Sequence, residues 1–280
     1  NELVGSYKGK KITEYVRKDY HKLAEDIIRT TEDNIFDPMI IKTKRWNNYK
    51  KKFLSATSNT IDDLEFQIGF FALTRKIGFS HYYLFSNKTA TSEEIEKPSL
   101  KEIDKNTVLL TLPNFAEKKE DIKPLLDSIL QKAYTTLIID IRNNAGGNFE
   151  STFLIANFLT DKEFVSGFFP NRNWYETYNR LPVKSDIDKF SLIDNDTTQI
   201  HSKYGFYIKT KSSMNIFKGK TYLLVNHNTG SSAEALAIGA KEYNLAEIGG
   251  ENTAGGLLRA KQFEIDKDIT LIVPINDFIS

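Results

Sequence analysis

The strongest constraint on the fold of this sequence is a pattern that occurs twice: an apolar strand, a polar loop that contains glycine, and a helix. The first copy has its predicted strand at 136–141 and its helix at 149–159, and the second has them at 221–225 and 232–242. Short apolar runs are typical of buried strands, and apolar residues three and four positions apart indicate a helix. Further elements are predicted as strands at 82–85 and 107–112, a helix around 122–130, and a hairpin over 262–273. This order predicts an α/β fold built in layers.

The beginning of the chain shows helical patterns only. Apolar spacing predicts one helix from Ile12 to before Pro38, a second around 46–54, and a third that opens at Thr60. The apolar positions predicted for the third helix are Leu64, Ile68, Phe71 and Leu73. Residues 1–79 are therefore predicted to form an N-terminal helical bundle.

Residues 80–280 are predicted to form the α/β domain. Within it, 167–220 has weak periodicity and many polar residues, so we interpret it as an irregular insertion with short strands. Long connections in compact domains are often functional, and this one could form a rim over a site.

Charge and composition exclude several classes of protein. Lys and Arg number 38 against 37 Asp and Glu, so the chain offers no strongly basic surface for nucleic acid. There is no cysteine, and the four histidines lack ligand spacing, so neither a metal nor another cofactor is expected. The run Lys50-Lys51-Lys52 is either a phosphate or membrane contact or, as charge runs usually are, a helix face in water.

No apolar run has the length of a membrane-spanning helix, so no spanning segment is expected. The sequence starts at Asn1 without Met, and a targeting segment could have been removed before it. Together with the absence of cysteine, this favours an exported protein in the periplasm or cell envelope.

A serine-rich loop joins the strand at 221–225 to the helix that follows. Ser231 would stand at the N-terminus of that helix, where free N–H groups and the helix dipole favour developing negative charge. That is a suitable place for a nucleophile. The alternative is that Ser231 or Ser232 only caps the helix.

A glycine loop follows the strand at 136–141. Gly146 and Gly147 allow backbone N–H groups to approach a ligand closely and could form an oxyanion hole, although a tight turn explains the glycines equally well. Asp140 and Arg142 are interpreted as a fixed polar pair that supports the loop.

One histidine lies where the helical region meets the first strand. His81, preceded by Ser80, stands at this junction, and pockets are common between domains. His81 could therefore be a general base, whereas a lone histidine is more often a satisfied polar residue.

In this order and spacing, the three segments resemble the tail-specific or C-terminal-processing serine peptidases, peptidase family S41. The segments are Ser80-His81, Asp140-Ile141-Arg142-Asn143-Asn144-Ala145-Gly146-Gly147, and Asn228-Thr229-Gly230-Ser231-Ser232-Ala233-Glu234, followed by Gly249-Gly250-Glu251-Asn252-Thr253-Ala254-Gly255-Gly256. The resemblance implies a ClpP/crotonase-like α/β core. It also implies that Ser231 is the nucleophile, because in the family this serine stands three residues before a helix glutamate.

Two branches of the family differ in their base. One uses a lysine in a Thr-x-Gly-Lys-Gly-like loop, but here that loop reads Thr253-Ala254-Gly255-Gly256-Leu257 and has no lysine. The other branch includes the tricorn core and the repeats of interphotoreceptor retinoid-binding protein, and Ser80-His81 resembles its serine-histidine pair. Lys241 and Lys261 remain alternative bases.

The sequence departs from the tricorn-like pattern in one catalytic residue. The acidic member of that tetrad is expected beyond Ser280, which leaves the C-terminal end of the domain incomplete, while Glu251 and Asp277 are expected to have structural roles. The peptide-binding PDZ module of many relatives has no room between Phe85 and Val108.

The resemblance implies a serine endopeptidase acting on peptides or unfolded proteins. In this interpretation, Ser231 attacks the peptide carbonyl, His81 takes its proton and Ser80 bridges His81 to the acid, while Ser232 with Gly146 or Gly147 holds the oxyanion. Two alternatives stay open: a non-catalytic protein that binds a peptide or apolar ligand in the same cleft, and a crotonase-like acyl-transfer enzyme.

Overall fold

A computed structural model divides the chain into two compact units. Unit 1 comprises Asn1–Ala90 and Ala260–Val273, and unit 2 comprises Thr91–Arg259 and Pro274–Ser280. The predicted domain boundary between residues 79 and 80 stays a prediction. The residues that the structure describes are 5–7, 10–12, 18–86, 96–116, 119–193, 202–211 and 213–280.

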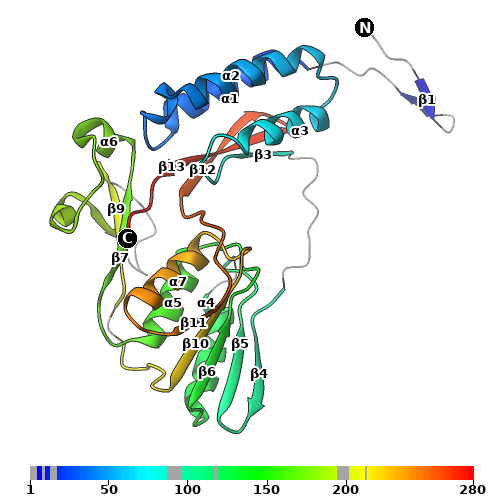
Figure 1. Ribbon diagram of the computed structural model, residues 1–280. Coiled ribbons are helices and arrows are strands. Elements are labelled where there is room, and N and C mark those ends of the chain that lie inside the picture. The colour runs from blue at the N-terminus through cyan, green and yellow to red at the C-terminus, as the bar shows by residue number, and fades with distance from the viewer. Residues whose placement is uncertain are drawn as a thin grey trace. The chain divides into compact units, whose positions relative to one another are not determined.

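Three capped α-helices form the helical part of unit 1 (Figure 1). They are α1 (Tyr20–Asn34), α2 (Lys44–Ala56) and α3 (Asp63–Thr74), with short 3-10 helices η1 (Ile40–Lys42) and η2 (Thr57–Asn59) between them. The side chains of Asp19, Thr43 and Asp62 accept hydrogen bonds from the first turns of the three helices. Such caps fix where a helix begins.

Two predicted helix starts are wrong. Ile12 lies in the short strand β2 (Lys10–Ile12), which pairs with β1 (Gly5–Tyr7), and residues 13–17 of the predicted helix lie outside the described part of the chain. The third helix starts at Asp63 rather than at Thr60, because the Asp62 carboxylate accepts the Glu65 N–H at 2.9 Å.

The buried face of α3 also differs from the prediction. Phe66 and Phe70 are buried, whereas Leu64, Ile68 and Phe71 are exposed. An aromatic cluster explains the choice, because both buried rings pack against Phe53 of α2. The packing of these aromatic rings therefore determines which of the two apolar faces of α3 is buried.

Tyr82 lies in the core of unit 1 and joins its aromatic side chains. Its ring contacts Trp46, Tyr49 and Phe70, and its hydroxyl lies 2.9 Å from the hydroxyl of Thr31. Burial raises the pKa of Tyr82 to about 12, so the phenol stays neutral.

A three-stranded sheet completes unit 1. β13 (Ile269–Asn276) lies between β12 (Arg259–Asp266) and β3 (Tyr83–Ser86), and it pairs with β3 in antiparallel register. The hairpin predicted over 262–273 is thus confirmed. Lys18 joins its turn to α3, with Nζ within 3.1 Å of carboxylate oxygens of Asp63, Asp266 and Asp268.

Unit 2 is built on a five-stranded sheet with the order β11-β10-β6-β5-β4. The strands are β4 (Ser99–Asp104), β5 (Thr107–Thr111), β6 (Thr136–Asp140), β10 (Lys220–Val225) and β11 (Glu247–Gly250). All neighbouring pairs are parallel except β4 with β5. The carboxyl ends of β6 and β10 therefore lie at the same edge of the sheet, and so do the loops that follow them.

Three helices of unit 2 pack on this sheet (Figure 1). They are α4 (Lys119–Gln131), α5 (Phe149–Leu159) and α7 (Ser232–Glu242). Apolar helix residues such as Ile122, Ile155 and Leu236 share one core with the strand residues Ile139 and Leu223. The helices at 149–159 and 232–242 have the predicted bounds.

The segment predicted as an irregular insertion contains a second small sheet. Its order is β7-β9-β8, with β7 (Val165–Pro170), β8 (Ser191–Ile193) and β9 (Gly205–Lys209). The same segment holds α6 (Arg172–Tyr178) and η3 (Lys184–Lys189), and residues 194–201 lie outside the described chain. The short strands predicted there are confirmed.

None of the helices in the described part of the chain combines the length and the apolar character needed to cross a bilayer.

Candidate active site

The glycine loop after β6 and the serine loop after β10 are joined by direct hydrogen bonds. The Gly230 N–H donates to the Asn144 carbonyl at 2.9 Å, and the Thr229 hydroxyl donates to the Ile141 carbonyl at 2.9 Å. Asn144 and Thr229 are fully buried. These bonds fix the two loops relative to each other within unit 2.

Ser231 occupies the N-cap position of α7 in an unusual backbone conformation. Its φ is 54° and its ψ is −126°, a region that non-glycine residues rarely adopt. Strained backbone of this kind persists only where the surroundings hold it, and it is concentrated at functional sites. The N-cap position places Ser231 at the positive end of the α7 dipole.

Glu234 holds the backbone around Ser231. Its carboxylate is buried and accepts N–H groups from Ser231 at 3.1 Å, Gly255 at 2.7 Å and Gly256 at 2.8 Å. The Ser231 N–H also lies 3.1 Å from the Gly256 carbonyl oxygen. Glu234 therefore links the serine loop to the loop 253–257, the segment that resembles the lysine-carrying loop of the lysine-dependent peptidases but has no lysine.

From the sequence, Glu234 served only to identify Ser231 as the serine three residues before it. The available signal was the spacing Ser-x-x-Glu from Ser231, which is that of a capping box. The bonds to Gly255 and Gly256 were not predictable from that spacing, because those residues stand 21 and 22 positions after Glu234 in the chain.

Ser232 is buried, and its hydroxyl has no hydrogen-bond partner in the described chain. Its carbonyl accepts the Thr152 hydroxyl of α5 at 3.1 Å. A fully enclosed hydroxyl cannot meet a substrate, so of the two adjacent serines Ser231 is the candidate nucleophile.

Gly146 packs directly against the serine loop. A Cβ atom built on Gly146 would lie 2.7 Å from the Ser231 Cβ and 3.0 Å from the Ser232 nitrogen. The Gly146 φ of +98° also disfavours any other residue. The glycine thus permits the close approach of the two loops.

The two predicted glycine donors differ in what their N–H groups do. The Gly146 N–H donates to Asn144 Oδ1 at 2.8 Å. Within the described residues the Gly147 N–H has no hydrogen-bond partner, and the same holds for the Ser232 N–H. Gly147 is exposed and is therefore the better candidate for an oxyanion donor, whereas Ser232 is buried and its predicted role as a second donor stays a prediction.

Replacement of Gly146 by alanine tests this packing. We expect Gly146→Ala to lower kcat/KM for peptide hydrolysis by about 10²-fold or more, because the new methyl group would displace Ser231. In other enzymes the loss of a single oxyanion donor, which is a smaller change to the site, already costs about that much. Gly69→Ala is the control, since nothing lies within 4 Å of a Cβ there. Unchanged kinetics in Gly146→Ala would contradict the described approach of the loops.

Asp140 and Arg142 form the fixed polar pair that the sequence predicted. Arg142 Nε and Nη2 donate to the two Asp140 carboxylate oxygens at 2.9 and 2.6 Å. Burial by itself raises the pKa of Asp140, but the hydrogen bonds from Arg142 outweigh it and hold the pKa below its usual value. The pair stays ionised and supports the start of the glycine loop.

Ser80 and His81 lie in unit 1, between α3 and β3. The Ser80 Oγ is 2.9 Å from His81 Nδ1, the contact expected of a serine that orients a histidine. His81 has a φ of 57°, so its backbone is strained as well. Ser231 belongs to unit 2, and its meeting with His81 stays a prediction.

Glu251 and Asp277, the two carboxylates considered for the acidic member of the tetrad, both have hydrogen-bond partners elsewhere. Glu251 lies 2.8 Å from His227 Nδ1, and this hydrogen bond lowers the pKa of Glu251. Asp277 accepts the Tyr175 hydroxyl at 2.6 Å. The alternative bases Lys241 and Lys261 are exposed.

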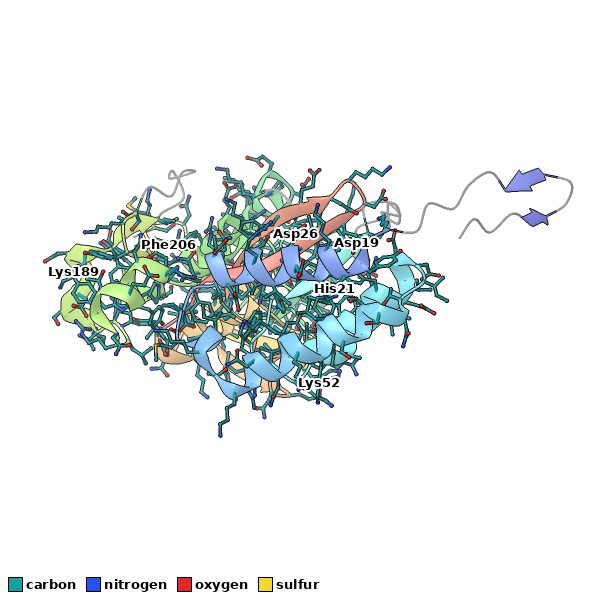
Figure 2. All side chains as sticks on the ribbon, turned by 90° about the horizontal axis from the view of Figure 1, so that it is seen from above. Asp19, His21, Asp26, Lys52, Lys189 and Phe206 are labelled. Carbon is teal, nitrogen blue, oxygen red and sulfur yellow. The ribbon has the colours of Figure 1, made fainter. Side chains whose placement is uncertain are left out.

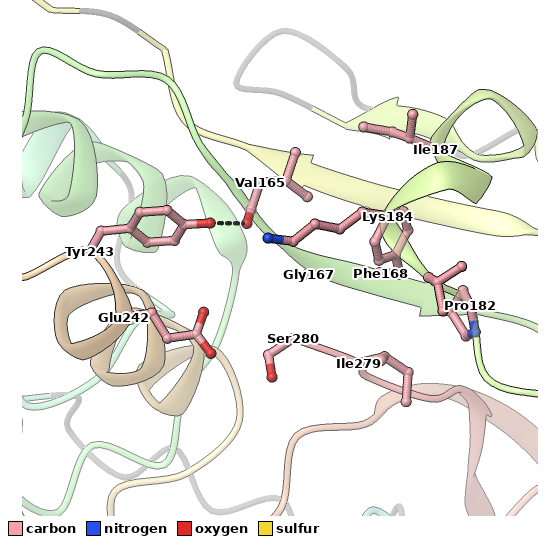
Figure 3. A pocket seen from close by; sticks show the side chains of 11 residues that line it. Val165, Gly167, Phe168, Pro182, Lys184, Ile187, Glu242, Tyr243, Ile279 and Ser280 are labelled. Carbon is pink, nitrogen blue, oxygen red and sulfur yellow. Dashed lines mark hydrogen bonds between the residues drawn. The ribbon is translucent and has the colours of Figure 1, made fainter.

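Unit 2 also contains one large cavity. It has a volume of about 600 Å³ and is lined by residues including Phe168, Lys184 and Tyr243, but by none of the candidate catalytic residues (Figure 3). Tyr243 donates its hydroxyl to the Val165 carbonyl at 2.9 Å at the edge of this cavity. Size alone therefore does not identify the reactive site.

Comparison with known proteins gives two curated relatives. The nisin-resistance protein of Lactococcus lactis subsp. lactis is 27% identical over 223 residues, which cover 76% of this chain and 64% of that protein. The tail-specific protease of Haemophilus influenzae is 25% identical over 175 residues, which cover 61% of this chain and 21% of that protein. The chain thus spans less than two thirds of the length of either relative.

A solved structure shares the fold. The photosystem II D1 C-terminal processing protease has a TM-score of 0.59 and 10% identity, with 94% of this chain and 89% of that chain covered. The predicted fold class, a ClpP/crotonase-like α/β core with an N-terminal helical region, is confirmed. The sequence profile described as Peptidase family S41 matches residues 106–280.

Proposed function

Because this chain belongs to peptidase family S41, we propose that it is a serine endopeptidase whose nucleophile is Ser231. The observation that carries the proposal is the strained conformation of Ser231 at the start of α7, packed against Gly146. The substrates we propose are peptides or unfolded proteins, in keeping with the family.

The proposed reaction starts with attack of Ser231 Oγ on the carbonyl carbon of a peptide bond. His81 takes the hydroxyl proton through Nε2, while Ser80 orients the ring through Nδ1. The exposed N–H of Gly147 holds the negative oxygen of the tetrahedral intermediate, and the N–H of Ser232 would join it only if the loop opens to the substrate. His81 then gives its proton to the leaving amine, and water hydrolyses the acyl-enzyme with His81 again as the base.

The second candidate is a protein that binds a peptide or apolar ligand without cleaving it. The buried and bonded framework around Ser231 favours the enzyme, because a binding cleft alone has no need for a strained serine at a helix N-terminus. The crotonase-like alternative leaves Ser231 without a role.

A fluorophosphonate probe separates the two candidates, because it labels only an activated serine hydroxyl. We expect the probe to label the chain at Ser231, as located by mass spectrometry of the digested protein. In parallel, an unfolded test protein is incubated with the chain and its fragments are sequenced. Binding of the test protein with neither labelling nor fragments would favour the binding protein.

We further propose that the protein works outside the cytoplasm, in the periplasm or cell envelope. The absence of cysteine supports this location, because such a chain has no thiol that an oxidising compartment could convert. Fractionation of cells that produce the protein from its whole gene tests it.

A further inference from the structure

Unit 1 presents an apolar stripe on the exposed side of α3. The stripe consists of Leu64, Ile68 and Phe71, which are spaced four and three positions apart and so share one face, together with Ile61 just before the helix. In chain order from Ile61, the exposed fractions are 55, 64, 59 and 41%. Soluble proteins seldom expose apolar side chains together in this way unless the surface has a partner.

Basic side chains also lie beside α3, at a groove that the four stripe residues do not themselves line. A groove of about 670 Å³ between α2 and α3 is lined by Lys51 and Lys52 on one side and by Ala72 and Leu73 on the other. Arg75 lies one helical turn after Phe71. Lys52 is among the side chains labelled in Figure 2.

The positive charge is concentrated in this part of the chain. Residues 44–76 contain seven basic and three acidic side chains, a net charge of +4, whereas the whole chain has +1. Lys50 is paired with Glu32 at 2.7 Å, but among the described residues Lys51, Lys52 and Arg75 have no acidic partner. These three cations remain available to an external anion.

The acidic side chains of this face are already engaged at the other end of α3. Asp62 and Glu65 accept backbone N–H groups at the helix start, and Asp63 is paired with Lys18. Among the described residues, none of these carboxylates forms an ion pair with Lys51, Lys52 or Arg75.

We propose that this face docks on the surface of an anionic membrane. The apolar stripe would enter the interfacial layer, and Lys51, Lys52 and Arg75 would contact lipid phosphates, as in helices that lie in a membrane interface. A second copy of the chain fits less well, because a symmetric interface would bring two like-charged faces together.

Vesicle sedimentation tests the proposal with the whole chain. Vesicles of phosphatidylcholine with about 30% phosphatidylglycerol are compared with vesicles of phosphatidylcholine alone. We expect binding at least tenfold stronger to the anionic vesicles. The double variant Lys51→Gln/Lys52→Gln should lose about 10-fold or more, since each cation near such a surface contributes about fivefold.

Matched variants provide the controls. Lys101→Gln/Lys105→Gln makes the same change in net charge at exposed positions of unit 2 and should change vesicle binding less than about twofold. Leu64→Asn should weaken binding, whereas Leu181→Asn, at another exposed leucine, should not. Thermal unfolding verifies that each variant is folded.

Three results would overturn the proposal. They are equal binding to both kinds of vesicle, equal losses in the two lysine double variants, and absence of vesicle binding by the folded chain. Sedimentation velocity tests whether a second copy of the chain occupies the stripe instead. A chain that binds no vesicles but forms a dimer, and whose dimer dissociates in Leu64→Asn, would assign the stripe to a second copy.

Discussion

Ser231→Ala should lower the turnover of peptide hydrolysis by about 10⁴-fold or more, because loss of the nucleophile in other serine peptidases costs up to about 10⁶-fold. The Michaelis constant should change little, since the methyl group of alanine keeps the shape of the site apart from one oxygen atom. Single-turnover and steady-state kinetics on the same peptide measure both quantities.

Ser232→Ala is the matched control for this variant. The Ser232 hydroxyl is buried without a partner in the described chain, so its removal should leave turnover within a few-fold. Labelling by the fluorophosphonate probe should survive in Ser232→Ala and disappear in Ser231→Ala. Equal behaviour of the two variants would show that the assigned nucleophile is wrong.

His81→Ala should lower turnover by about 10³-fold to 10⁴-fold, since the general base of a serine peptidase contributes on this scale. Ser80→Ala should lower it by about tenfold or more, because the His81 ring loses the contact at 2.9 Å that orients it. Both losses should appear in kcat rather than in KM, and steady-state kinetics on a peptide separates them.

His227→Ala provides the comparison for His81→Ala. His227 stands in the serine loop itself, four residues before Ser231, but it is exposed and paired with Glu251. Its removal should change turnover less than about threefold. A larger effect in His227→Ala than in His81→Ala would move the base from unit 1 to the serine loop.

Local patterns predicted the core of unit 2 because sequence and burial agree there. The strands at 136–141 and 221–225 are largely apolar, and the parallel sheet buries them. β4 was not predicted, because five of its six residues are exposed, three are charged, and only Leu100 packs against the core. β4 is held in the sheet by its backbone pairing with β5, and such a strand shows no apolar pattern in the sequence.

The buried face of α3 could not be predicted from periodicity. The helix is apolar around most of its circumference, so the spacing of Leu64, Ile68 and Phe71 resembled that of a core face. Phe66 and Phe70 are buried instead because aromatic partners from α2 and Tyr82 meet that side. Such partners are distant in the sequence, and the pattern within one helix does not contain them.

The sequence predicted which loops form the candidate site, but not the hydrogen bonds that hold these loops in place. The residues of the serine and glycine loops follow apolar strands, which gives a local signal. The bonds from Glu234 to Gly255 and Gly256, and from Gly230 to Asn144, join segments that only the fold brings together.

These cross-loop bonds have a consequence for how the site meets a substrate. The Gly230 N–H, the Asn144 carbonyl and the Glu234 carboxylate hold the loops in place through hydrogen bonds within the protein, independently of any bound peptide. A site that is preorganised in this way spends little binding energy on assembling itself, so more of that energy is available to stabilise the transition state. Substrate selection in such an enzyme then depends on access to the serine rather than on a substrate-driven rearrangement of these loops.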